Sequence, residues 1–264
     1  MSTILLPTPE IVAQFHRDGF LVVPGVLSPT EVATLRAGVE RVFAVPSAEA
    51  EMYGHAAIWR PKMFEHGAEF EALLDHPGIA QFMDHCLGPD CHIIANNALR
   101  TGPGQAISGW HVDECVRFPL ARGVPLDPRA IMPPCIINSH YYLGDVDVEL
   151  GPTQFIPGSH RSGRSPEPAD LDAGGQPSWE GRSFVSAQGA AGTCVIWHDQ
   201  VWHRGGPNLS AGRTRWAVQK AFARRWISQR FWPFVGYRPP EDVIARATPH
   251  RKRLLGFHSI GAYG

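Results

Sequence analysis

The sequence predicts a mainly β protein with a layer of helices at its N-terminal end. Of its 264 residues, 27 are Gly and 24 are Pro, and residues that favour turns in such numbers indicate many short strands. Up to residue 91 the apolar spacing is typical of helices, whereas short apolar runs bounded by turn residues follow. We therefore expect one domain over residues 1–264, with a helical layer at about 8–91 and a β core at about 92–222. The segment 223–264 carries no pattern that assigns it.

The N-terminal elements have recognisable ends. Thr8 is a predicted helix N-cap, and that helix is expected to end near Gly19. The apolar run 20–23 then predicts a buried strand. Ser28 and Glu31 have the spacing of a capping box, which predicts the start of a second amphipathic helix.

The β core is expected to contain strands joined by two long inserts. The predicted strands cover residues 92–99, 134–143, 153–156, 193–198 and 215–222. The inserts, 114–133 and 157–192, are rich in Pro, Gly and charged residues and show no apolar period. Long loops of this kind are usually functional, so we expect both to border the site and to act as its mobile walls.

Charge and cysteine content exclude several classes of protein. A formal net charge of −1 provides no attraction for nucleic acid or an anionic membrane. The sequence has no apolar run long enough to span a bilayer and no features of a signal peptide at its start. Its five cysteines are an odd number and form no Cys-x-x-Cys pair, which argues against a disulfide framework. We therefore expect a cytoplasmic protein that acts on a small molecule, and the sequence indicates no oligomeric state.

The pair His111 and Asp113 is the first candidate for metal binding. On a strand, residues two apart point to the same face, so both side chains could reach one ion. His203, which follows the predicted strand 193–198, is the best candidate for a third ligand, and His160 and His198 are weaker alternatives. Two histidines and one carboxylate form a facial triad, which leaves open positions on the metal and is typical of non-haem Fe(II) oxygenases.

Two arginines follow the candidate triad. Arg213 and Arg215 lie ten and twelve residues after His203, and Arg215 opens an apolar strand. A guanidinium in that place could bind a carboxylate with two parallel hydrogen bonds.

Four stretches together resemble the phytanoyl-CoA dioxygenase-like branch of the Fe(II)- and 2-oxoglutarate-dependent oxygenases. They are residues 18–23, 110–113, 151–160 and 202–210 followed by the arginines. Their order and spacing are more specific than any one of them. The resemblance implies a double-stranded β-helix, which is a jelly roll of the cupin type, with the triad at the mouth of the barrel.

The resemblance also implies roles for four residues near the cosubstrate. In the family, an arginine on the strand after the second metal histidine binds the distal carboxylate of 2-oxoglutarate. This arginine usually lies about eleven residues after that histidine, so Arg213 and Arg215 both remain candidates. Arg215 fits the start of the strand better. His140 lies roughly where the family contacts the cosubstrate, and packing inside the barrel is an equal alternative for it. Ser210 is expected to shape a turn and could touch the same carboxylate.

The expected activity is oxidation of an unactivated C–H bond by dioxygen, with hydroxylation, desaturation or ring closure as the outcome. Iron(II) is the expected cofactor, and 2-oxoglutarate and O2 are the expected cosubstrates. The Arg-rich composition, with only three lysines among 24 basic residues, is typical of a GC-rich bacterial genome and favours natural-product tailoring, with a sugar as one possible substrate. The alternatives are a non-catalytic cupin-like binding protein and a metal-dependent enzyme that uses no 2-oxoglutarate.

Overall fold

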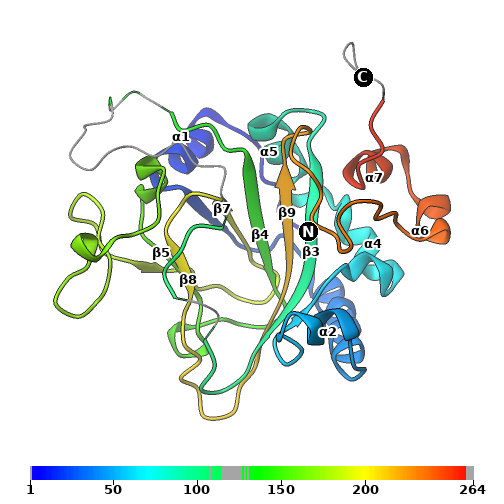
Figure 1. Ribbon diagram of the computed structural model, residues 1–264, viewed down its shortest axis with the longest axis horizontal. Helices are drawn as coiled ribbons and strands as arrows, with labels where there is room; N and C mark the ends of the chain where they lie inside the picture. Colours follow the sequence, from blue (N-terminus) through cyan, green and yellow to red (C-terminus); the bar gives the residue numbers. More distant parts are fainter. Residues whose placement is uncertain (1, 107–108, 114–126, 128, 130, 260–264) are drawn as a thin grey trace.

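The computed structural model describes residues 2–106, 109–113, 127, 129 and 131–259. Its strands form two antiparallel sheets (Figure 1). The large sheet has the order β1 (Phe20–Val23), β7 (Cys194–His198), β4 (Ile136–Tyr142), β9 (Arg215–Ala223), β3 (His92–Thr101) and β2 (Trp59–Arg60). The small sheet has the order β6 (Val185–Ser186), β5 (Thr153–Phe155) and β8 (His203–Gly205). The mainly β fold with flanking helices is therefore confirmed.

Helices cover the face of the large sheet that is turned away from the small sheet (Figure 1). They are α1 (Pro9–Asp18), α2 (Pro29–Phe43), α3 (Ala48–Met52), α4 (Ala68–Leu74), α5 (Pro77–Leu87), α6 (Glu241–Arg246) and α7 (Pro249–Leu254). Short 3-10 turns lie at Met63–Glu65, Val148–Leu150, Ser159–Ser162 and Pro168–Asp170. None of the helices in the described part of the chain has the length and apolar character needed to cross a membrane.

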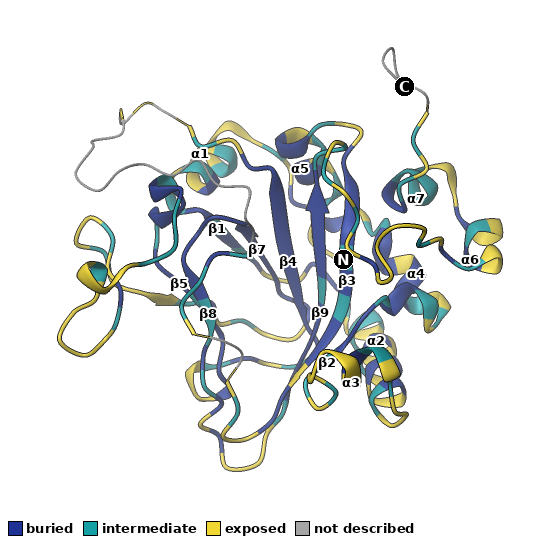
Figure 2. Cartoon of the chain, viewed as in Figure 1, coloured by how far each residue is buried: buried dark blue, intermediate teal, exposed yellow. Residues whose placement is uncertain are grey.

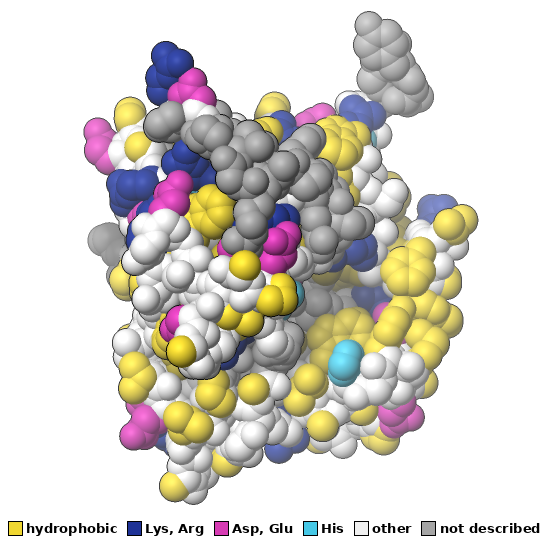
Figure 3. All heavy atoms as spheres, turned by 60° about the vertical axis from the view of Figure 1, so that its left-hand side comes forward, with side chains coloured by type: hydrophobic (Ala, Val, Ile, Leu, Met, Phe, Trp, Pro, Cys, Tyr) yellow, Lys and Arg dark blue, Asp and Glu magenta, His cyan; other side chains and the backbone are white. Residues whose placement is uncertain are grey.

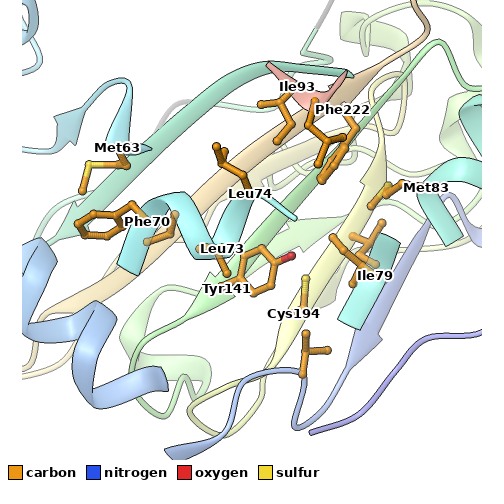
Figure 4. Close-up of a cluster of buried hydrophobic side chains, with 14 of the residues drawn as sticks. Met63, Phe70, Leu73, Leu74, Ile79, Met83, Ile93, Tyr141, Cys194 and Phe222 are labelled. Atoms are coloured by element: carbon orange, nitrogen blue, oxygen red, sulfur yellow. The ribbon is translucent and has the colours of Figure 1, made fainter. Parts of the chain in front are cut away.

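The main hydrophobic core lies between these helices and the large sheet. Tyr141 and Phe222 project from the strands toward Leu73, Leu74 and Ile79 of the helical layer (Figure 4). Strands β4, β7 and β9 are buried along nearly their whole lengths (Figure 2). A central strand that is buried on both faces can present one set of side chains to the core and the alternate set to a site.

Strand β4 shows this division most clearly. Ile137 and Tyr141 belong to the core under the helices. The alternate residues Asn138 and His140 point into the space between the two sheets, where they line the cavities described below. The alternation along β4 thus brings polar side chains to the interior of the barrel.

The predicted ends of the N-terminal elements are confirmed. The Thr8 hydroxyl accepts a hydrogen bond from the Ile11 amide at 3.4 Å, and Ser28 forms a capping box with Glu31. Gly19 ends α1 with φ of 83°, a left-handed conformation that glycine adopts without strain.

The sequence predicted the longer strands to within about two residues but missed the short ones. Strands β2, β6 and β8 have only two or three residues each, too few to show a period. The prediction that His111 and Asp113 lie on a strand is wrong, because His111 forms only an isolated bridge with His203. The segment 223–264, which had no assignment, contains α6 and α7.

Candidate metal centre and cosubstrate chamber

The structure brings His111, Asp113 and His203 together. One possible ligand atom from each lies within 4.8 Å of the others. Asp113 Oδ1 is 3.6 Å from His111 Nε2 and 3.4 Å from His203 Nε2. Among the described residues, no other group of histidine, cysteine or acidic side chains has this geometry.

Backbone contacts orient both imidazole rings. The amides and carbonyls of His111 and His203 exchange two hydrogen bonds of 3.0 Å, which holds the loop 109–113 against β8. The Nδ1 atom of His111 lies 2.8 Å from the Gly109 carbonyl, and that of His203 lies 2.9 Å from the Val201 carbonyl. A carbonyl accepts only from a protonated nitrogen, so these contacts place the lone pair on Nε2, where a metal would bind.

Two neutral donors hold the carboxylate of Asp113. Asn138 Nδ2 and Trp197 Nε1 donate to Oδ2 at 2.7 and 2.9 Å, while Oδ1 is the oxygen nearest both imidazoles. Burial alone would raise the pKa of Asp113, but the neighbouring His203 and His111 imidazoles hold that pKa well below its usual range. The group is therefore an anion at neutral pH, as a metal ligand must be.

The donor set of the cluster fits a divalent iron ion. Two ligands at right angles, each about 2.1 Å from an ion, lie about 3 Å apart, and the observed separations of 3.4 and 3.6 Å need only a small inward movement to reach this. Two imidazoles and one carboxylate on one side leave the other side of an octahedral ion open for further ligands.

A chamber of about 240 Å³ adjoins the cluster. Its lining includes His140, Thr153 and Arg215 together with the three candidate ligands. The Arg215 side chain is 2% exposed, and among the described residues its hydrogen-bond partners are the neutral oxygens Gly151 O and Thr101 Oγ1, the latter at 3.2 Å. A buried guanidinium held in this way can receive a carboxylate from a ligand.

His140 lies beside this guanidinium in a neutral form. Burial and the charge of Arg215 lower the pKa of His140 to about 3. Its Nδ1 lies 3.5 Å from Thr153 Oγ1, and its buried Nε2 has no hydrogen-bond partner in the described structure. An unpartnered buried polar atom beside a buried cation fits a chamber shaped for a polar, anionic guest.

The other residues singled out in the sequence lie away from this chamber. Arg213 is exposed and pairs with Asp147 at 2.7 Å and with Glu149 at 3.3 Å. Ser210 Oγ donates to Asn208 Oδ1 at 2.6 Å, so it shapes the turn and does not line the chamber.

The two weaker candidates for the third ligand also lie elsewhere. His160 Nε2 contacts the His16 carbonyl at 3.0 Å, and His198 Nδ1 lies 3.0 Å from Asp199 Oδ1. Neither imidazole is part of the cluster around Asp113.

Sequence reasoning missed Asn138 and Trp197. They are direct partners across β4 and β7, so their side chains share one face of the sheet. The signal was present in the alternation of the predicted strand 134–143, because Asn138 is two residues from His140. A second cavity, of about 330 Å³, has Asn138 in its lining and shares Asp113 and Gln219 with the chamber, so the two meet beside the cluster.

One predicted insert contacts Trp110, the residue before His111. Within 157–192, the Gln176 side chain accepts a hydrogen bond of 3.3 Å from Trp110 Nε1, and the Phe184 ring lies 6.0 Å from the Trp110 ring. The insert therefore packs against the loop that carries His111, while neither cavity at the cluster has a described residue of 157–192 in its lining. Most of the other insert, 114–126 with 128 and 130, lies outside the described residues.

Comparison with known proteins gives the family. Residues 15–217 match the family model described as phytanoyl-CoA dioxygenase (PhyH). The chain is 26% identical to the dioxygenase FrzG of Cladobotryum sp over 281 residues, which covers 95% of this chain and 85% of that protein. It is 22% identical to the multifunctional dioxygenase ausE of Emericella nidulans, with coverage of 96% and 85%.

Solved structures share the fold. The 2-oxoglutarate-dependent carbocyclase SnoK from nogalamycin biosynthesis superposes with a TM-score of 0.61 at 22% identity, covering 92% of each chain. The epimerase SnoN, solved with Fe3+, α-ketoglutarate and nogalamycin RO, gives 0.61 at 23% identity, covering 87% of this chain and 89% of that one. Since the family model spans most of the sequence, the chain belongs to the phytanoyl-CoA dioxygenase family and is a 2-oxoglutarate-dependent dioxygenase with a jelly-roll fold that uses Fe(II) and O2.

Proposed function

We propose that this protein oxidises an unactivated C–H bond of a small natural product, in a bacterial tailoring pathway in the cytoplasm, and that one domain over residues 1–264 carries the activity. His111, Asp113 and His203 would hold the iron, and Arg215 and His140 would hold 2-oxoglutarate. The observation that carries the proposal is the joint geometry of the cluster and the chamber. Three ligand atoms within 4.8 Å of one another adjoin a cavity that contains a buried arginine with neutral partners.

Each residue has a task that follows from its contacts. Bound iron and 2-oxoglutarate together supply the oxidising power, with succinate and carbon dioxide as by-products. Arg215 would orient the cosubstrate through its far carboxylate, and the neutral His140 would offer Nε2 as a hydrogen-bond partner in the same chamber. Asn138 and Trp197 keep Asp113 in place through their hydrogen bonds to Oδ2.

The type of substrate is suggested by the second cavity. Its lining combines aromatic rings, such as Tyr53 and Trp59, with the amides of Asn97, Asn138 and Gln219. Aromatic faces beside amide groups suit a ring that carries hydroxyl groups, which supports a sugar or a similarly hydroxylated product as the substrate. The outcome at the oxidised carbon, whether hydroxylation, desaturation or ring closure, depends on that substrate.

The competing function is a protein that binds a metal or ligand without turnover. The complete cluster and the buried arginine argue against it, because a site without a catalytic task has no need of all four groups at the cost of burying their charges.

The decisive experiment measures succinate released from 2-oxoglutarate in the presence of Fe(II) and oxygen. We expect release by the wild type, loss in His203→Ala, and retention in His198→Gln, which changes a nearby buried histidine outside the cluster. If the folded, iron-loaded wild type releases no succinate with or without a panel of hydroxylated ring compounds, the protein is a binding protein and the proposal is wrong.

A further inference from the structure

The 330 Å³ cavity changes in character from its inner end to its mouth. Asn138 and Gln219 lie at the inner end, since Asn138 donates to Asp113 and Gln219 also lines the cosubstrate chamber. Tyr53 and Phe234 lie at the mouth, because both line the cavity while much of each side chain is exposed. On the face drawn in Figure 3, hydrophobic side chains gather beside a hollow. The cavity therefore offers amides beside the metal centre and aromatic rings toward solvent.

Phe234 has a backbone conformation that its residue type normally avoids. Its φ of 65° lies in the left-handed region, where a bulky side chain is strained and glycine is not. Among the described residues only three that are not glycine have such a backbone, and two of them, Lys62 and Phe234, line this cavity. Strain of this kind persists where the surrounding contacts enforce it, and it is concentrated at functional sites.

Contacts on both sides of Phe234 hold the loop around it. The Phe231 ring packs against Phe64 with centroids 5.2 Å apart, and the Tyr237 hydroxyl donates to Glu65 Oε1 at 2.6 Å. The Phe234 amide also donates to the Phe231 carbonyl at 2.6 Å. The loop is thus anchored before and after Phe234, so these contacts set the position of the residue at the mouth.

The folded protein alone gives little reason for a phenylalanine at this position. Phe234 is 53% exposed, and the next residue, Val235, is 94% exposed. A glycine would relieve the backbone strain at the loss of a ring that is only half-buried. A bound ligand does give a reason, because an aromatic side chain at the mouth gains by stacking on the flat face of a ring, and exposed apolar side chains beside a cavity commonly mark a binding site.

We propose that Phe234 selects the substrate, by stacking on the apolar outer part of a ring compound whose hydroxylated edge lies against the amides beside the metal centre. The inference rests on the proposed function, because it treats the cavity as the substrate side of that centre. It adds a residue that determines specificity and an orientation: the substrate has a flat apolar face at one end and hydroxyl groups at the other.

A probe with these two ends is 2-naphthol, in which one ring carries a hydroxyl group and the other is bare. It is titrated by fluorescence into protein loaded with Zn(II) and 2-oxoglutarate, since zinc supports no turnover. We expect Phe234→Gly to weaken binding about tenfold, the effect of a lost stacking contact. Phe234→Tyr keeps the ring and should bind like the wild type. Val235→Ala trims an exposed neighbour outside the lining and should change binding less than about twofold.

Melting temperatures separate a role in substrate binding from a role in the fold. Phe234→Gly should melt higher than the wild type or no more than about 4 °C lower, because glycine relieves the strain. A larger fall that accompanies weaker binding would assign Phe234 to the fold and overturn the inference. Unchanged binding of 2-naphthol in Phe234→Gly, or an equal loss in Val235→Ala, would overturn it as well.

The orientation is tested with Mn(II) in place of Zn(II), under nitrogen. Paramagnetic Mn(II) speeds the relaxation of nearby ligand protons, so the naphthol protons beside the hydroxyl group should relax faster than those of the bare ring. Equal or reversed relaxation, or a wild type that does not bind 2-naphthol, overturns the inference. Succinate release is measured separately on the Fe(II)-loaded enzyme, so this inference and the proposed function fail in different experiments.

Discussion

Asn138 donates a hydrogen bond of 2.7 Å from its side-chain amide to Oδ2 of Asp113. The indole of Trp197 donates a second one to the same oxygen at 2.9 Å. Both donors occupy the lone pairs of Oδ2, so the other oxygen is the one left to bind a metal. A carboxylate held in this way would bind through one oxygen and leave a coordination position open, which an enzyme that must admit both a cosubstrate and dioxygen requires.

Removing either donor should therefore weaken metal binding. We expect Asn138→Ala and Trp197→Phe each to lower the affinity for Mn(II), a stable substitute for Fe(II), by about 10- to 100-fold, as is usual when a residue that holds a metal ligand is lost. Isothermal titration under nitrogen gives this number directly.

The matched control is Asn97→Ala. Asn97 lines the neighbouring cavity and donates to Gln219 Oε1 at 3.3 Å, so its loss should leave Mn(II) affinity within about twofold. If the wild type and the variants Asn138→Ala, Trp197→Phe and Asn97→Ala all bind Mn(II) with equal affinity, Asp113 needs no support from the side chains on β4 and β7.

Arg215 and Arg213 should differ sharply in their effect on 2-oxoglutarate. Arg215→Ala removes the buried guanidinium of the chamber and should cost roughly 2–5 kcal/mol in cosubstrate binding. Arg213→Ala removes an exposed partner of Asp147 and Glu149 and should leave that affinity unchanged. Binding is measured by titrating 2-oxoglutarate into the metal-loaded proteins, and loss in the Arg213 variant with retention in the Arg215 variant would reverse the assignment.

The sequence predicted the three residues of the cluster but gave a wrong reason for one pair. His111 and Asp113 were expected on a strand, where residues two apart share a face. In the structure the loop 109–113 is held by the mutual hydrogen bonds of His111 and His203. This pairing joins residues 92 positions apart, and no local pattern reports a contact at such a distance.

The choice between Arg213 and Arg215 also depended on the tertiary structure. Both follow His203 at a plausible distance, and only the pairing of Arg215 with Thr101 across β9 and β3 turns its side chain into the barrel. The aromatic residues that line the second cavity were not predicted at all. Tyr53 directly follows α3 and Trp59 lies on the short strand β2, while Phe231 and Phe234 come from the unassigned C-terminal segment.

The insert 157–192 should be coupled to the metal loop through Phe184. Its ring lies 6.0 Å from the Trp110 ring, and the Arg204 guanidinium lies 4.7 Å from Trp110 and 5.8 Å from Phe184. We expect Phe184→Ala to speed backbone hydrogen exchange both in 157–192 and in 109–113, because it removes one of the side-chain contacts that tie the two segments together. Val185→Ala, which trims an exposed neighbour on β6, serves as the control, and faster exchange confined to the insert would show that the two segments move independently.

Lys220 should make the stability of the protein depend on pH in an unusual direction. Its ammonium group is fully buried under the helical layer, where Nζ donates to the Leu73 carbonyl at 2.6 Å, near the end of α4. Burial lowers the pKa of Lys220 from its ordinary value to about 7. An unfolded lysine has a pKa of about 10.4. Between these two values the unfolded chain therefore binds more protons than the folded chain, and the free energy of unfolding should rise with pH.

Comparison with Lys220→Met isolates this contribution. From pH 7 to about 9.5 the free energy of unfolding of the wild type should rise relative to that of the variant by up to about 1.4 kcal/mol per pH unit. Below pH 7 the two should change in parallel, because Lys220 is then protonated in both states. Lys252→Met, which changes a lysine on the half-buried surface of α7, should follow the wild type throughout, with urea unfolding as the measurement. If the unfolding free energies of the wild type and Lys220→Met change in parallel above pH 7, the buried amine keeps its proton. The carbonyls at the end of α4 would then stabilise the ammonium group, together with the rings of Tyr141 and Phe222, which lie 4.9 and 5.0 Å from Nζ.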